Sequence, residues 1–201
     1  MTTSTDRLGW GWFARTRSRG GQQHYRWSIK TGSDAPAQSI QPTAPTVTTI
    51  SALTAEPIPA ALQGVKETPP GPARTSGVES TLYTLNVWLL RSHPETDGDY
   101  HLVLGDGQGN TMVAEIPDPT QVDQGGAFAA QVAAARQAFD ARHPEMKPLG
   151  QIRGGTGRPG LVEINEQVQI TGVGFFDFIH GQDGVAGNGI ELHPVVAITF
   201  S

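Results

Sequence analysis

The chain contains no cysteine. This absence excludes disulfide bonds and every thiolate metal site, including the usual structural zinc sites. A reducing compartment does not require disulfides, and a domain with an adequate core does not need them elsewhere. The missing cysteine therefore limits the chemistry of the protein but does not identify its compartment.

The chain also lacks the run of about eighteen apolar residues that predicts a transmembrane helix. Its only apolar patch near the N-terminus is LGWGWFA, and arginines follow this patch instead of preceding it. A secretory signal peptide has the opposite order and a longer apolar core. We therefore expect no membrane span and, by default, a cytoplasmic protein.

Apolar residues are scarce, at 37% of the chain, whereas 25 Gly and 15 Pro are present in 201 residues. This composition predicts many turns and short strands in one domain with an irregular extension. Charge is unevenly distributed: residues 1–78 carry a net +4 and residues 79–201 a net −9. An acidic domain repels phosphate, which disfavours a broad nucleic-acid surface.

The N-terminal part divides into two segments. Residues 1–46 are basic and are predicted to form a disordered leader, because they cannot bury enough apolar area to order themselves. Residues 47–78 are a Pro-rich linker. Within it, VTTISALTAEPIPAAL contains regularly placed apolar residues and is predicted to dock on the folded domain as a short helix or strap.

The folded domain is expected over residues 79–201. Alternating β-branched, aromatic and apolar residues predict five strands at 80–90, 99–106, 111–117, 161–176 and 189–200. Between the third and fourth strands, apolar residues recur every three to four positions, which predicts a helix at about 126–142. Three strands, a helix and two strands is the element order of the OB-fold. The predicted fold is therefore mainly β: a five-stranded, OB-like Greek-key barrel after a long irregular N-terminal segment.

Four segments carry a family resemblance: DGDYHLVLGD, TMVAEIPDP, VQITGVGFFDFIHGQDGVAGNGIELHPV and the preceding ISALTAEPIPAAL. Over about residues 50–200 the chain resembles an uncharacterised bacterial family of small OB-fold-like β-barrel proteins. The resemblance implies the barrel fold but no reaction. Members often look exported and often carry a cysteine after the EIPDP segment, where this chain has Thr120 and Gln121.

Histidines and acids provide a candidate metal site. His101 is placed on the outer face or rim of its strand, because Tyr100, Leu102 and Leu104 form the apolar face. The simpler interpretation is a surface or cross-strand pairing histidine. In the last strand, one face carries Glu191 and His193, which are expected either to orient each other or to share a metal. The candidate ligands of a divalent ion such as Zn or Mn are His101, His180, Glu191 and His193.

Candidate ligand-binding residues cluster in the glycine-rich stretch at 174–189. Phe176 and Phe178 share one face and are able to stack on bases or sugars, although packing in the core explains the same pattern. The full set of candidate ligand contacts is His101, Phe176, Phe178, Asp177, His180 and Arg153. Asp97, Asp99 and Asp106 are explained as turn residues that bind their own backbone.

No complete catalytic constellation is present. The Gly-rich segments at 105–110 and 154–160 precede strands, so they lack the helix that a phosphate-binding loop requires, and there is no GxSxG motif. The leading hypothesis is therefore a non-catalytic OB-type binding module for an oligonucleotide or an oligosaccharide. Two alternatives stay open: a metal-dependent hydrolase or nuclease, and an assembly protein that donates segment 47–53 to a neighbour's sheet.

Overall fold

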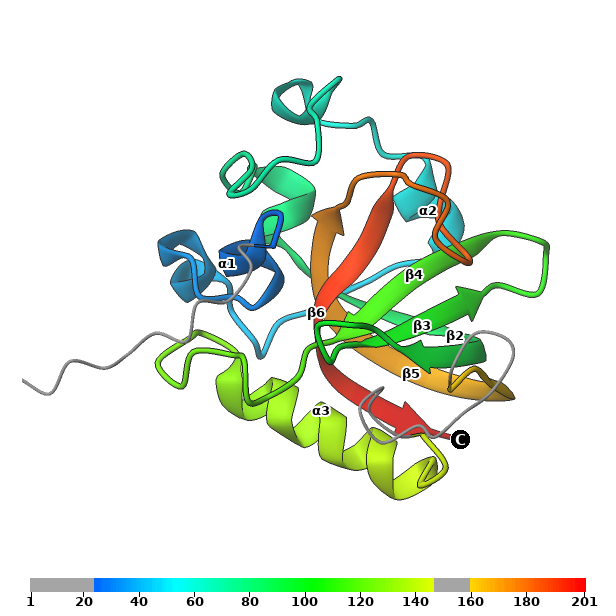
Figure 1. The fold of residues 1–201 in the computed structure, drawn as a ribbon. Helices are drawn as coiled ribbons and strands as arrows, with labels where there is room; N and C mark the ends of the chain where they lie inside the picture. The colour runs from blue at the N-terminus through cyan, green and yellow to red at the C-terminus, as the bar shows by residue number, and fades with distance from the viewer. Residues whose placement is uncertain (1–23, 147–159) are drawn as a thin grey trace, which may run out of the picture.

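The computed structural model describes residues 24–146 and 160–201 (Figure 1). Its strands are β1 (Thr46–Val47), β2 (Leu82–Pro94), β3 (Tyr100–Gly105), β4 (Thr111–Ile116), β5 (Val162–Phe176) and β6 (Ile190–Phe200). The α-helices are α1 (Trp27–Lys30), α2 (Ile50–Thr54) and α3 (Ala129–Arg142). Short 3₁₀ helices lie at Ala35–Ser39, Ala60–Leu62 and Gly77–Ser80. The five predicted strands are present within a few residues of their expected bounds.

The strands form one mixed sheet with the order β1-β2-β3-β4-β6-β5, and β2 pairs with β5 as well. Each of the strands β3 to β6 is thus paired with two others, and β2 is paired with three. The β4–β6 and β1–β2 pairs are parallel, and the remaining pairs are antiparallel. The strands β2 and β5 are long enough to pair with each other and also with a further strand, β3 in the case of β2 and β6 in the case of β5. The protein is mainly β, with one helix between β4 and β5.

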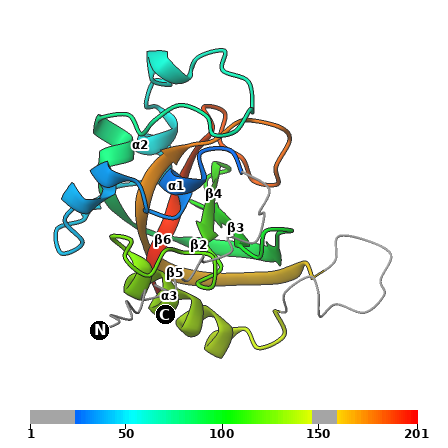
Figure 2. The ribbon, with the colours of Figure 1, turned by 60° about the vertical axis from the view of Figure 1, so that its left-hand side comes forward.

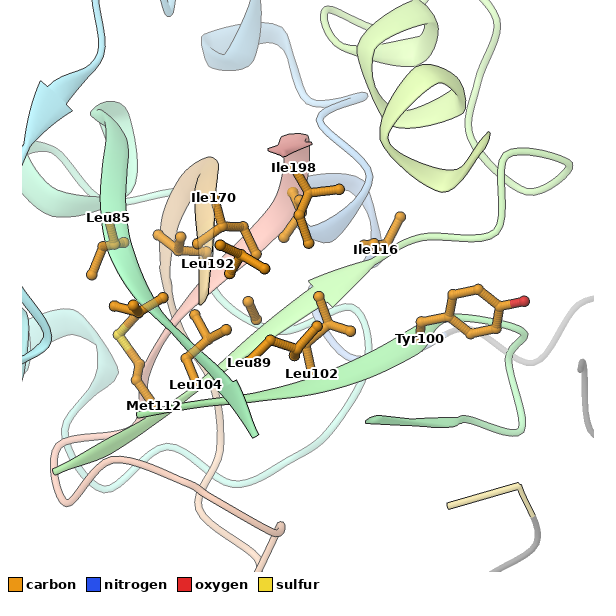
Figure 3. Packing of buried hydrophobic residues seen from close by; sticks show 14 of the residues in the cluster. Leu85, Leu89, Tyr100, Leu102, Leu104, Met112, Ile116, Ile170, Leu192 and Ile198 are labelled. Atoms are coloured by element: carbon orange, nitrogen blue, oxygen red, sulfur yellow. The ribbon is translucent and has the colours of Figure 1, made fainter. Parts of the chain in front are cut away.

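The hydrophobic core lies inside this ring of strands, as the labelled side chains of Figure 3 show. Alternation along β2 sends Leu85 and Leu89 inward, while Asn86 and Trp88 face outward. The neighbouring strands contribute the same pattern. The labelled core residues are Leu85, Leu89, Tyr100, Leu102, Leu104, Met112, Ile116, Ile170, Leu192 and Ile198.

Helix α3 begins at Ala129, three residues after its predicted start, and ends at the predicted residue Arg142. It packs beside β6 (Figure 1) and buries Val132, Ala135 and Phe139, which is the stripe expected from the sequence. Tyr100 stacks against Phe139 with a ring-centroid distance of 5.2 Å. Within the described ranges, no helix combines the length and apolar character that a membrane crossing needs.

Residues 24–46 differ from the predicted disordered leader. They form α1 and a 3₁₀ turn, and they lie against the sheet (Figure 2). The reason is a buried ion pair: Arg26 and Glu79 side chains are both 0% exposed, with an Nη2–Oε2 distance of 2.7 Å. A segment with too little apolar area to fold alone is held here by contacts with the rest of the chain. The leader residues 1–23 lie outside the described ranges.

The strap predicted after residue 47 docks on its own chain. Ile50 and Leu53 of α2 are buried in the main core, and Thr49 caps the helix by accepting a hydrogen bond from the Ala52 amide. β1 pairs with β2 of the same chain. Segment 47–53, the candidate arm for assembly, is therefore occupied within the protein.

Candidate metal centre

Four adjacent strands place one polar side chain each in a row across the outer face of the sheet. In the antiparallel pairs, His93 of β2 lies opposite His101 of β3, and His101 lies opposite Glu115 of β4. The parallel β4–β6 pairing runs to Ala114 and Leu192. One residue further along, Glu115 and His193 are side by side. The row depends on strand register, so it brings together residues that are far apart in the sequence.

The side chains of this row are in contact. The Nδ1 atom of His101 lies 3.2 Å from Oε1 of Glu115, and the other oxygen of Glu115 lies 3.1 Å from Nδ1 of His193. Glu191 is also 3.1 Å from that nitrogen. On the other side of the ring, Nε2 of His193 is 3.5 Å from Oδ2 of Asp99. Two histidines and three carboxylates thus form one connected cluster.

His101 has a defined orientation, and its Nδ1 atom faces carboxylates. Its Nε2 lies 2.8 Å from the carbonyl oxygen of Asp183. Because a carbonyl only accepts, Nε2 must carry the hydrogen, and in a neutral ring Nδ1 then bears a lone pair. That lone pair faces the carboxylates of Glu115 and, at 3.8 Å, Glu95. Such an arrangement requires either a proton or a cation between the nitrogen and the oxygens.

His93 and Glu95 extend the cluster toward solvent. His93 Nε2 lies 2.9 Å from Oε1 of Glu95, and the rings of His93 and His101 have centroids 4.6 Å apart. One ligand atom from each of His93, Glu95 and His101 lies within 4.8 Å of the other two. Ligands of a four-coordinate zinc ion are about 3–4 Å apart, as bond lengths of about 2.1 Å require.

His193 forms the buried base of the cluster. Burial opposes its charged form, but the negative charge of Glu115 and hydrogen bonds with Asp99, Glu115 and Glu191 outweigh this effect and raise the pKa of His193 well above its usual range. Burial raises the pKa of Glu115, yet the charge of His193 and hydrogen bonds from both histidines hold it well below normal. His193 is therefore a charged ring that positions Glu115.

The negative charge of the cluster is not fully balanced by positive charge. Burial, with repulsion from Asp177 and Glu115, raises the pKa of Glu191 to about 7. Lys30 of α1 supplies a positive charge, with its Nζ 2.8 Å from Oδ2 of Asp177. Burial opposes this charge, but attraction to Asp177, Glu115 and Glu191 raises the pKa of Lys30. Lys30 is an internal cation for an acidic site.

A cavity of about 210 Å³ opens onto the cluster. Its floor includes His101 and Glu115, and Glu95 lies at its edge. The surrounding wall comes from three regions: the N-terminal segment, the β2–β3 turn and the loop after β5. The wall residues are His24, Tyr25, Lys30, Glu67, Thr96, Asp97, Asp177, His180 and Gln182. A small ion or molecule in this cavity therefore contacts Glu95, His101 and Glu115.

The structure brings together three of the four predicted metal ligands. His101, Glu191 and His193 belong to the cluster, and the predicted contact between Glu191 and His193 is present. His101 does face outward and pair across strands, but it is 2% exposed instead of lying on the surface. The β5–β6 loop covers it. His180 does not join the cluster: its ring stacks on Phe178, with centroids 6.3 Å apart.

The predicted ligand contacts are only partly accessible. Phe176 is 3% exposed and belongs to the core, so its assignment as a ligand contact is wrong. Phe178 is 36% exposed, and Asp177 and His180 line the cavity. Phe176 is the last residue of β5, and its side chain packs in the main core. Arg153 lies outside the described residues.

Sequence reasoning missed Glu115, Lys30 and the pair formed by His93 and Glu95. Glu115 follows the outward alternation of its strand, and an outward acid opposite His101 was the available signal. Asp106 binds its own turn as predicted, through the Gln108 and Asn110 amides. Asp99 was assigned the same role, but its Oδ2 faces His193.

Comparisons with known proteins yield little. No protein-family model matches the chain, and no curated protein matches it. Among solved structures, it is similar to an asparaginyl-tRNA synthetase from Entamoeba histolytica in complex with asparaginyl-adenylate (10% identity, TM-score 0.34, 64% of this chain). It is also similar to an aspartyl-tRNA synthetase from Leishmania major (13% identity, TM-score 0.35, 81% of this chain). The chain spans 22% of either protein, and these TM-scores carry no functional conclusion.

Proposed function

We propose that this protein is an OB-type binding module that holds a divalent metal ion in the cavity above His101. The pairing cycle β2-β3-β4-β6-β5-β2 supports the OB assignment, because it joins five strands with a helix between the third and fourth. The same topology supports the proposed membership in the bacterial family of small OB-like barrels.

The position of the cavity supports a binding role. OB barrels bind ligands on the face of their second and third strands and on the adjoining loops. Here those strands are β3 and β4, and the cavity is bordered by the β2–β3 turn and the β5–β6 loop. The proposed ligand thus occupies the usual place for this fold.

The covering of that face argues for a small ligand. Every residue of β3 is buried, including the outward-facing His101 and Val103. Gly184 of the β5–β6 loop lies against Val103, where even one added carbon at residue 184 would be 2.4 Å from it. Arg91 holds the same loop through a bidentate ion pair with Asp183. A strand of nucleic acid has no open surface there, whereas a metal ion fits the remaining cavity.

The orientation of His101 carries the metal assignment. Histidines that bind metals usually donate their second N–H to a carbonyl or carboxylate, as His101 does to Asp183. The proposed ligands are His93, Glu95 and His101, with Glu115 as a fourth. Imidazole and carboxylate ligands without thiolate suit Zn²⁺ or Mn²⁺. His193 then orients Glu115 from the inside.

Calorimetric titration of the metal-free chain with ZnCl₂ and MnCl₂ tests this assignment. We expect one ion per chain and at least a tenfold weaker affinity in H101Q. His143→Gln is the matched control, since His143 is a buried histidine beside Glu145 but outside the cluster. Circular dichroism verifies folding. An H101Q protein that is folded and binds with unchanged affinity contradicts the assignment, as does a wild-type chain that binds neither ion.

A hydrolytic role is the second candidate. The cavity reaches Glu95, His101 and Glu115, so a metal held there has room for a water molecule, which is the requirement for metal-activated hydrolysis. Turnover of bis(p-nitrophenyl) phosphate with added Mn²⁺ or Zn²⁺, lost in H101Q, supports this role. Metal binding without turnover of this substrate supports the non-catalytic module.

A further inference from the structure

A second candidate site lies on the outer face of β2, around Trp88. This indole is 40% exposed, although Trp side chains are usually well covered. It lines two hollows, one of about 590 Å³ and one of about 420 Å³. We call these two hollows and Trp88 together the Trp88 groove. A large exposed aromatic ring between two hollows is a typical feature of a ligand site.

Polar groups in the groove are mostly neutral. Amide and hydroxyl side chains predominate among the described residues that line it: Thr49, Ser51, Asn86, Gln108, Asn110, Thr111, Asn165, Gln167 and Ser201. Asp106 is the one charged side chain in that lining. Its carboxylate already accepts hydrogen bonds from Asn110 Nδ2 at 2.6 Å and the Gln108 amide at 2.8 Å. The groove therefore offers both donors and acceptors with little net charge.

Glycines keep one side of the groove open. Gly105 lies opposite Trp88 in the β2–β3 pair, and an added β-carbon there would be 2.9 Å from Leu90. Gly107 has a φ of 74°, a conformation that side chains disfavour. An added β-carbon at Gly107 would lie 3.9 Å from the indole Nε1 of Trp88, so a larger side chain at that position would fill the space beside the ring. The turn thus maintains access to the ring.

This chemistry selects a class of ligand. The apolar face of a sugar ring stacks on an indole, and its hydroxyls pair with amides and hydroxyls, which donate and accept. A single-stranded nucleic acid also stacks, but it requires basic groups for its phosphates. The described lining contains no Lys or Arg. We infer that the Trp88 groove binds a neutral oligosaccharide.

The groove is separate from the proposed metal centre. Trp88 lies opposite Gly105 and His93 opposite His101, so the two sites are four residues apart along β3, or about 13 Å. Val103 lies between them and is covered by Gly184 of the β5–β6 loop. Oligosaccharide binding in the groove therefore does not depend on a bound metal ion.

The test is a calorimetric titration of the full chain with cellohexaose and, separately, with chitohexaose. We expect saturable binding of at least one hexasaccharide at millimolar concentration or below, weakened at least tenfold in W88A. Trp27→Ala is the matched control, because Trp27 stacks on His24 and is absent from the groove lining. Binding should be unchanged in W27A and in the presence of EDTA.

A second variant and a competing ligand keep the test decisive. Gln167 is exposed and lies opposite Trp88 in the β2–β5 pair, so Q167A should weaken binding several-fold without affecting folding. The inference is overturned if neither hexasaccharide binds, or if folded W88A and Q167A bind as the wild type does. It is also overturned if an oligo(dT) strand binds through Trp88 more tightly than the sugars do.

Discussion

Two buried charged regions lie within this protein, and they differ in how completely their polar groups are satisfied. At the Arg26–Glu79 pair, all donor nitrogens of the guanidinium are used, on Glu79 and on the carbonyls of Pro72, Ala73 and Phe176. Glu79 accepts further hydrogen bonds from Phe176 and Thr75. The pair is neutral and complete.

The cluster around His101 is neither neutral nor fully hydrogen-bonded. Asp99 Oδ2 and His193 Nε2 face each other only at a long 3.5 Å, and the buried Nδ1 of His93 has no hydrogen-bond partner among the described residues. Glu191 has a pKa raised to about 7 by burial and by repulsion from Asp177 and Glu115. Buried polar atoms are nearly always satisfied, so exceptions require an explanation. The contrast suggests different roles: the first region fixes the N-terminal segment, and the second is arranged for a ligand.

The largest expected effect comes from breaking the complete pair. R26M leaves Glu79 buried without its partner, which should lower the free energy of unfolding by about 3–5 kcal/mol. Urea denaturation measures this change. The control is R142M, because Arg142 pairs with Glu166 at the surface, where such pairs contribute about 1 kcal/mol or less. Equal effects of the two substitutions would contradict the structural role of Arg26.

The same pair predicts an acid-sensitive stability. Burial raises the pKa of Glu79, but hydrogen bonds and the charge of Arg26 lower it below its usual value. Its stabilising effect is therefore complete above the unfolded pKa of about 4.3 and is lost as the pH falls through the lower folded value. Urea unfolding of wild type and E79Q from pH 6 to pH 3 checks this. The stability difference should shrink toward acid, and a constant difference would contradict it.

The pH dependence of stability should have the opposite sign at the cluster around His101. Because the pKa of Glu191 is raised to about 7, ionisation of this group costs stability as the pH rises from about 4.3 through 7. E191Q removes that cost, so in the presence of a chelator it should be more stable than the wild type at pH 8, by on the order of 3–4 kcal/mol. The advantage should disappear near pH 5. A loss of stability in E191Q at pH 8 would show that Glu191 is compensated after all.

The smallest effect concerns Lys30. Its ammonium group neutralises part of the cluster through Asp177 and is attracted to Glu115 and Glu191. K30M makes the site more negative, so zinc affinity should rise several-fold in calorimetric titration. K66M, at an exposed lysine of the N-terminal segment, should leave the affinity unchanged. A weaker affinity in K30M would mean that Lys30 supports the site instead of competing with its ligand.

Sequence periodicity determined the elements of this fold. Two patterns are local properties: the alternation along strands such as 161–176 and the three-to-four spacing of Val132, Ala135 and Phe139. They can therefore be recognised from the sequence alone. The same locality explains why the contact between Glu191 and His193 was predicted correctly. These residues share one strand face, and no distant partner is needed to bring them together.

Tertiary structure decided the make-up of the site. Strand register and the burial of outward-facing residues by loops both depend on segments that are distant in the sequence. Only strand pairing places Glu115 between His101 and His193, and only the β5–β6 loop turns the outward-facing His101 into a buried residue. The defined structure of residues 24–46 also depends on tertiary contacts, since Arg26 binds Glu79 and a backbone carbonyl far along the chain. Local pattern specified which side chains face outward, and three-dimensional packing decided which of them meet and which remain accessible.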